Sequence, residues 1–132
     1  MSALNATNLG CSLTCKDIAA SIRWYEQALG FAVAMRFENQ GKLAGAVIVD
    51  GNIQIVLNQD DGALGWDRIK GQGFYLQINV NGPADVDAAA ARIKAAGGTL
   101  IDEPADRPWG ARMFQFRDPD GFKLGVSTPL QQ

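Results

Sequence analysis

The chain has 132 residues, which suffices for one hydrophobic core and is too short for two independent ones. Its 12 Lys and Arg residues stand against 14 Asp and Glu residues, a net charge of −2, and they form no basic stripe that would neutralise a row of phosphates. This balance of charges argues against a nucleic-acid partner. The sequence shows no secretory signal and no run of about 20 apolar residues, which predicts a cytoplasmic protein outside the membrane.

The first half of the chain predicts one strand, one helix and three further strands. Residues 9–15 are short and rich in small and apolar residues, as in a strand. Asp17 can cap a helix whose apolar residues recur every three or four positions up to Leu29, and Gly30 suits its end. The three strands that follow are predicted at residues 31–37, 43–49 and 52–57. Asp50-Gly51 is a tight-turn signal between the last two.

The second half repeats this order after a polar connection at residues 58–72. A strand at residues 74–80 precedes an alanine-rich helix from Pro83 to Ala96, which Gly97-Gly98 ends. Three short strands are then predicted at residues 99–101, 112–116 and 122–127, the last two joined by the turn Asp118-Pro119-Asp120-Gly121.

The repeated order predicts an internal duplication within one domain, residues 1–132. The first half-repeat spans about residues 8–59, the linker about 60–72 and the second half-repeat about 73–128. One helix cannot cover both faces of a four-stranded sheet, so the halves must pack together or against a partner chain.

Two segments identify a family. The first is the run DIAASIRWY at residues 17–25 with Leu29-Gly30-Phe31. The second is PWGAR at residues 108–112 with DPDG at 118–121. They resemble the opening and closing segments of the glyoxalase, bleomycin-resistance and extradiol-dioxygenase proteins, which form the vicinal-oxygen-chelate (VOC) superfamily. The resemblance covers about residues 8–128. It implies an α+β fold of two βαβββ modules that form open, U-shaped mixed sheets, the glyoxalase/bleomycin-resistance fold.

The resemblance also implies a divalent metal inside the sheets, held by His, Gln or Glu side chains of the first and last strands of each half. The family's ligand positions fall here on Gly10, Ile55, Tyr75 and Gly125. These residues cannot hold a divalent ion, and the chain contains no histidine. A shift of one residue brings in Cys11 or Gln54, among others, and still makes no site. We therefore expect no metal and no cofactor, as in the metal-free, bleomycin-resistance-like branch of the superfamily.

Strand alternation predicts which side chains share the cavity with the former metal positions. The cavity side is predicted to carry Gly10, Ser12 and Thr14, then Tyr75, Gln77 and Asn79, Met113 and Gln115, and Ile53, Ile55 and Leu57. The side that faces the second helix is predicted to carry Phe74, Leu76, Ile78 and Val80, with Phe114 and Phe116. An apolar wall facing a polar one suits an amphipathic organic ligand.

These features predict a protein that binds or sequesters a small amphipathic or aromatic molecule in a cavity at a homodimer interface. The expected ligand contacts are Tyr75, Gln77, Met113, Gln115, Trp109 and Ile55, with no catalytic residue. Trp109 is included because its loop leads into the strand of Met113 and should lie at the cavity mouth.

Two alternatives remain open at this point. The polar side chains could line a solvated groove, or the chain could be a lyase or dioxygenase-type enzyme of the same superfamily with a non-standard or metal-independent site. In such an enzyme, Tyr75 would act in acid–base chemistry with Arg112, Lys123 or an acidic residue.

Overall fold

The computed structural model of the chain describes residues 4–66 and 68–130. The first half contains β1 (Ser12–Cys15), α1 (Ile18–Trp24), the π-helical turn η1 (Tyr25–Leu29), β2 (Ala32–Asn39), β3 (Lys42–Asp50) and β4 (Ile53–Gln59). The second half contains β5 (Leu76–Asn79), α2 (Pro83–Ala95), β6 (Ala105–Arg107), β7 (Ala111–Arg117) and β8 (Lys123–Pro129). Among these described residues, no helix is long and apolar enough to cross a membrane.

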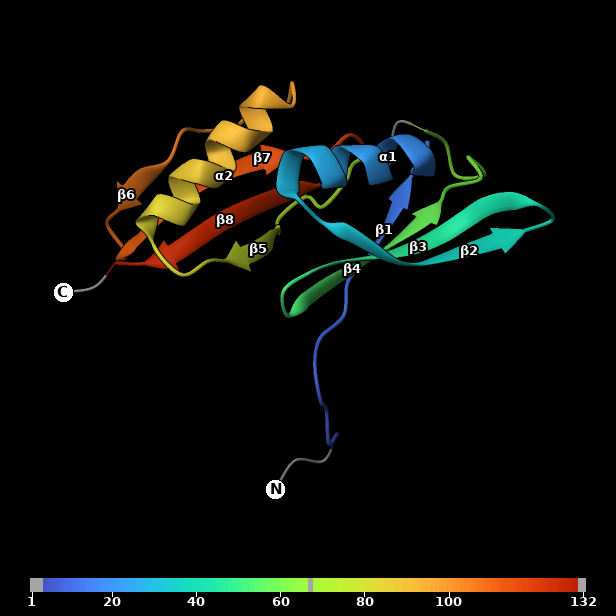
Figure 1. Ribbon diagram of the computed structural model, residues 1–132, viewed down its shortest axis with the longest axis horizontal. Coiled ribbons are helices and arrows are strands. Elements are labelled where there is room, and N and C mark those ends of the chain that lie inside the picture. Colours follow the sequence, from blue (N-terminus) through green and yellow to red (C-terminus); the bar gives the residue numbers. More distant parts are fainter. Residues whose placement is uncertain (1–3, 67, 131–132) are drawn as a thin grey trace.

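The strands form two four-stranded mixed sheets with the same internal order. Sheet A runs β1-β4-β3-β2 and sheet B runs β5-β8-β7-β6. In each sheet the first strand pairs in parallel with the last strand of its half, and the other pairs are antiparallel. The two sheets lie side by side with both helices on the same side of them (Figure 1). The predicted α+β fold of two βαβββ modules is therefore confirmed.

Local sequence signals explain where the helices begin and end. The Asp17 carboxylate accepts a hydrogen bond from the Ala20 N–H at 3.2 Å, so it caps α1 as predicted. Gly30 ends η1 with φ of 76°, a left-handed conformation that favours glycine. Pro83 stands in the first turn of α2, where a missing N–H costs nothing.

The core consists of one apolar cluster under each helix, and the two clusters meet. The cluster under α1 includes Tyr25 and Ile48, and the cluster under α2 includes Phe114 and Phe116. Five half-buried side chains pack against both clusters: Trp24, Leu29, Leu76, Ile78 and Phe122. Because the seam between the halves is apolar, burial of its surface holds the halves together.

A polar contact reinforces this seam, and we call it the turn clasp. It joins the β7–β8 turn to α1 and the segment before it. The Tyr25 hydroxyl donates to Asp118 Oδ2 at 2.8 Å, and Asp120 accepts from the Lys16 N–H at 2.7 Å and the Ser21 hydroxyl at 3.0 Å. Burial raises the pKa of the Asp118 carboxyl, although the hydrogen bond from Tyr25 acts in the opposite direction.

The second strand of the second half lies later in the chain than predicted. Instead of residues 99–101, the strand is β6 at Ala105–Arg107, and Leu100 forms only an isolated bridge with Phe116. Pro104 has no N–H to donate to the neighbouring strand, so the pairing is interrupted there and resumes in β6.

The predicted orientation of β4 is wrong by one residue. Its register with β1 places Leu57 beside Leu13 and Val56 beside Ser12, so Ile53, Ile55 and Leu57 share the helix-facing side. Ile55 is only 5% exposed and belongs to the core cluster under α1. The side away from the helix carries Gln54, Val56 and Asn58 instead.

The lengths of the two final hairpin turns explain this error. The expected cavity-side positions of the last strands, Ile55 and Gly125, each lie four residues after the glycine of an Asp-Gly pair. In the first half Asp50 pairs with Ile53, so the turn contains residues 51–52, whereas in the second half Arg117 pairs with Lys123 and the turn contains residues 118–122. Because the two turns differ in length by an odd number of residues, Ile55 and Gly125 lie on opposite faces of their strands relative to the helix.

The expected strand 74–80 is also shorter than predicted. Phe74 precedes β5 and is 61% exposed, so the prediction that it packs against α2 is wrong. Leu76, Ile78 and Val80 do pack against the cluster under that helix, as expected.

The turn clasp generates a stability prediction. Tyr25→Phe removes the hydroxyl that donates to Asp118 and should lower the free energy of unfolding by about 1–3 kcal/mol at neutral pH. The hydrogen bond favours the charged carboxylate, so its contribution is present at neutral pH and is lost as the pH falls through the raised pKa of Asp118. Urea unfolding across this pH range checks both statements, with Tyr75→Phe, the loss of a half-buried hydroxyl, as the control. An equal loss at every pH would contradict the proposed cause.

Candidate ligand-binding crevice

The face of sheet B that points away from α2 carries most of the predicted contacts, and we call it the open face. Strand registers place Gln77 beside Gly125, Gly125 beside Gln115, and Ser127 beside Met113. Gln77, Met113 and Gln115 therefore share one face of sheet B, as predicted. Phe114 and Phe116 occupy the opposite face, within the cluster under α2, also as predicted.

The Tyr75 ring lies directly over Gly125. A Cβ atom added at Gly125 would come within 2.9 Å of Tyr75 Cε2, closer than real Cβ contacts, so the ring occupies the space of the missing side chain. Lys123 Nζ lies 5.5 Å from the centroid of the same ring, a cation–π arrangement. The glycine thus allows a half-buried aromatic ring to approach this strand closely.

The polar groups of β5 form a row along the open face. The Tyr75 hydroxyl donates to Gln77 Oε1 at 3.2 Å, and Gln77 Nε2 donates to Asn79 Oδ1 at 2.9 Å. A hydroxyl can also accept, and each amide group has further donor or acceptor capacity. The row can therefore offer hydrogen bonds to a molecule lying on it.

A crevice of about 400 Å³ separates β5 from the start of β1 and β4. Its lining comprises Leu9, Gly10, Cys11, Ile53, Gln54 and Ile55 from the first half and Tyr75, Leu76, Gln77, Ile78, Asn79 and Leu124 from the second. Aliphatic side chains predominate, and the polar row of β5 forms one wall. This volume lies within the usual range for small-molecule sites.

The crevice brings together only part of the predicted contact set. Tyr75 and Gln77 line it, and Ile55 reaches it from the core side. Met113 is buried and Gln115 half-buried on the open face, outside the crevice lining. Trp109 lies in the β6–β7 turn at the outer edge of sheet B, where it is 70% exposed.

The residues around the crevice do not fit the divalent metal that the fold family implies. Gln54, Tyr75 and Gln77 offer only neutral oxygen and nitrogen atoms, and the Lys123 ammonium lies beside the Tyr75 ring. Within residues 4–66 and 68–130, no three His, Cys, Asp or Glu side chains are grouped to hold a metal ion. Burial raises the pKa of the Cys11 thiol, which disfavours the thiolate form that binds metals.

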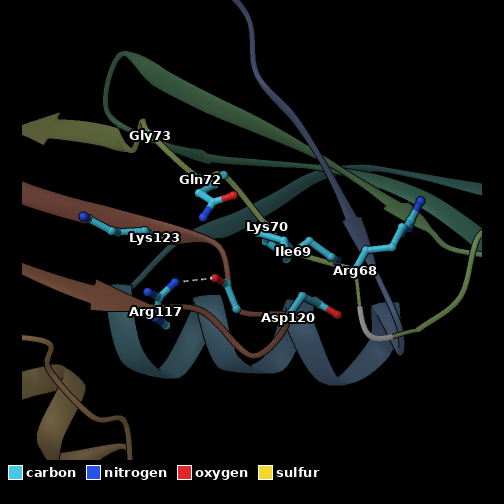
Figure 2. Close-up of a pocket in the computed structure, with 10 residues that line it drawn as sticks. Arg68, Ile69, Lys70, Gln72, Gly73, Arg117, Asp120 and Lys123 are labelled. Carbon is cyan, nitrogen blue, oxygen red and sulfur yellow. Dashed lines mark hydrogen bonds between the residues drawn. The ribbon is translucent and has the colours of Figure 1, made fainter.

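A second cavity, which we call the basic pocket, adjoins the open face and was not found from the sequence. It has a volume of about 430 Å³ and is lined by Arg68, Ile69, Lys70, Gly71, Gln72, Gly73, Arg117, Asp120, Gly121 and Lys123. Figure 2 shows Arg117 and Lys123 on neighbouring strands, with Gln72 and Lys70 of the connecting segment across from them. Strand alternation places Arg117 and Lys123 on the face of Gln115 and Gly125, but it does not bring Lys70 of the connecting segment to them.

Of the acid–base partners considered for Tyr75, only Lys123 lies near it. Arg112 forms ion pairs with Asp87 at 2.9 Å and with Asp106 at 3.1 Å. These hydrogen bonds raise the pKa of the Arg112 guanidinium further, so it is no proton donor at neutral pH.

Comparisons with known proteins agree with this architecture. The model of the Glyoxalase/Bleomycin resistance protein/Dioxygenase superfamily matches residues 7–126. A solved glyoxylase/bleomycin resistance protein/dioxygenase domain from Frankia sp. EAN1pec has a TM-score of 0.80 and 26% identity, over 96% of this chain and 93% of that one. A lactoylglutathione lyase from Agrobacterium tumefaciens, at 16% identity and TM-score 0.70, covers 93% of each chain and shares the fold.

One curated relative is similar over a shorter stretch. The protein named "Putative glyoxylase CFP32" of Mycobacterium bovis is 46% identical over 48 residues, which are 36% of this chain and 18% of that protein. The match thus spans less than a fifth of the relative's length. Because the superfamily model covers nearly the whole chain and the solved structures share its two sheets, the chain belongs to the Glyoxalase/Bleomycin resistance protein/Dioxygenase superfamily.

Proposed function

We propose that this chain binds or sequesters a small aromatic or amphipathic compound in the crevice, with the Tyr75 ring as its principal contact. The observation that carries the proposal is the Tyr75 ring lying over Gly125 at the wall of an otherwise largely aliphatic crevice. A planar ligand could stack on this ring, and aromatic contacts provide large apolar area with specific geometry. The polar row of Gln77 and Asn79 would orient the ligand.

We also propose that two chains form a homodimer that covers this region. Large apolar side chains beside the crevice are exposed, with Leu9 at 98%, Phe74 at 61% and Ile53 at 38%. In sheet order, β1 and β5 each have one neighbour, so one edge of each is unpaired. A second copy would cover these groups and enclose a ligand more fully than one chain does.

The proposed contact with Tyr75 makes a binding prediction. Tyr75→Ala should weaken binding of aromatic hits from a compound library by about 1–3 kcal/mol without unfolding the chain, because the substitution removes the stacking surface. Gln115→Ala should weaken it less, since Gln115 lies outside the crevice lining. Titration by tryptophan fluorescence and thermal shift measures both effects. Trp109→Phe tests whether Trp109, at the outer edge of sheet B, contributes to the fluorescence change.

Phe37→Ala is the matched control for this titration. Phe37 is an exposed aromatic residue on β2, away from the crevice lining, so its loss should leave the affinity unchanged. Hits whose affinity ignores both Tyr75→Ala and Gln115→Ala would show that the crevice is not the binding site.

The homodimer is tested by the mass in solution. Light scattering at tens of micromolar chain should give twice the chain mass of 14.1 kDa. Ile53→Glu, a charge placed beside the crevice, should shift the distribution towards the monomer. A wild-type monomer at this concentration would remove the interface on which enclosure of the ligand depends.

The donor set makes a prediction about metal content. The purified protein should hold less than one equivalent of Zn, Fe, Ni, Mn or Mg per chain, because neutral amide and phenol groups beside a lysine bind divalent ions weakly. Elemental analysis after dialysis measures this. One metal ion per chain that resists dialysis would show that another set of residues forms a site.

A further inference from the structure

We infer that the ligand of the crevice carries an anionic group, a carboxylate or a phosphate, which binds in the basic pocket at Arg117, Lys123 and Lys70. This inference rests on the proposed function, because it places the anionic end of the ligand beside the aromatic contact at Tyr75. It adds the charge of the ligand, which the crevice by itself does not determine.

Two cations of the basic pocket are neighbours on paired strands. Arg117 on β7 and Lys123 on β8 are direct partners in the register, so their side chains leave the sheet on the same face. Cβ atoms of such partners lie about 4.5–5.5 Å apart, and like charges at this position destabilise a sheet. An anion bound between them would replace this repulsion with attraction.

The remaining cations of the pocket differ in their partners. Arg68 is paired with Asp60, and its side chain points away from the other cations in Figure 2. Lys70 lies across from the strand pair, with Nζ 4.7 Å from the centroid of the Phe122 ring. Among the residues that the structure describes, no ion pair joins Lys70, Arg117 or Lys123 to a carboxylate.

Among the described residues of the lining, Asp120 supplies the one carboxylate, against the cations Lys70, Arg117 and Lys123. Both oxygens of Asp120 are used in the turn clasp, where they accept from the Lys16 N–H and the Ser21 hydroxyl. Arg117 Nη1 donates to the Gly121 carbonyl at 3.0 Å, which fixes the guanidinium at the pocket and leaves further N–H groups free of that contact. Although the chain as a whole has a net charge of −2, the described residues of this lining carry more positive than negative charges.

Lys123 connects the pocket to the crevice. It lines the basic pocket, and its ammonium lies 5.5 Å from the centroid of the Tyr75 ring, which lines the crevice. A molecule the size of a substituted aromatic acid could therefore place its ring on Tyr75 and its anionic group on Lys123 and Arg117. Guanidinium and ammonium groups bind carboxylate and phosphate through charge-assisted hydrogen bonds, which are stronger than neutral ones.

The test compares 2-naphthoate with 2-naphthamide, a planar anion and a neutral compound of nearly the same shape. Isothermal titration of the full-length protein at pH 7.5 and fixed ionic strength should give an affinity about fivefold or more higher for the anion. Arg117→Gln and Lys123→Gln should each reduce this preference and leave the affinity for 2-naphthamide nearly unchanged. Lys42→Gln, at the distant β2–β3 turn, is the matched control, and circular dichroism checks the fold of each variant.

A second arm uses inorganic phosphate, which has no ring. At equal ionic strength, phosphate should raise the thermal midpoint of the wild-type protein above its value in chloride, and should do so less in Arg117→Gln. Equal affinity for the two naphthyl probes would overturn the anion site while leaving the proposed function in place. Stabilisation by phosphate that Arg117→Gln reduces, without binding of either probe, would support the anion site and contradict the aromatic contact at Tyr75, whereas equal stabilisation of both proteins would reflect the general salt effect and overturn the site. Absence of every effect would overturn both.

Discussion

The packing of the two halves depends on the contact between the β7–β8 turn and the first helix. Neither half can bury its sheet with one helix, so the apolar seam around Trp24 and Phe122 must form, and the turn clasp fixes how the halves meet. The equivalent β3–β4 turn is too short to offer similar carboxylates. The two halves therefore share a topology, but the carboxylates of the turn clasp come from the β7–β8 turn and not from the β3–β4 turn.

The turn clasp also determines the electrostatics of the binding region. Asp120 lies in the lining of the basic pocket, where its charge would otherwise pair with Arg117 or Lys123. Its oxygens accept from the Lys16 backbone N–H and the Ser21 hydroxyl instead. One aspartate thus contributes to the seam, and among the described residues the neighbouring cations Lys70, Arg117 and Lys123 have no ion-pair partner.

Most of the fold could be predicted because it follows from local signals. Asp17, Gly30 and the turn from Asp118 to Gly121 each mark an element boundary through their own backbone chemistry. The face of β7 was also predicted correctly, since the five-residue turn 118–122 has a characteristic glycine. The face of β4 was not predicted correctly. Each added turn residue reverses which side chains of the following strand face the helix, and the pair Asp50-Gly51 alone does not give the length of the turn.

The candidate site was predicted only in part because it depends on how two sheets approach each other. Tyr75 and Gln77 were found from alternation on one strand, whereas the basic pocket needs Lys70 of the linker next to Arg117 of β7. No periodic pattern relates residues from such different segments. Trp109 illustrates the opposite case, since its closeness in sequence to Met113 did not bring it to the crevice.

The Tyr75 ring over Gly125 couples these two positions on neighbouring segments of sheet B. A larger residue at 125 would displace the ring, and a smaller residue at 75 would leave a void over the glycine. Any side chain introduced at 125 alone would meet the ring, so a redesign of this part of the open face has to change both positions together.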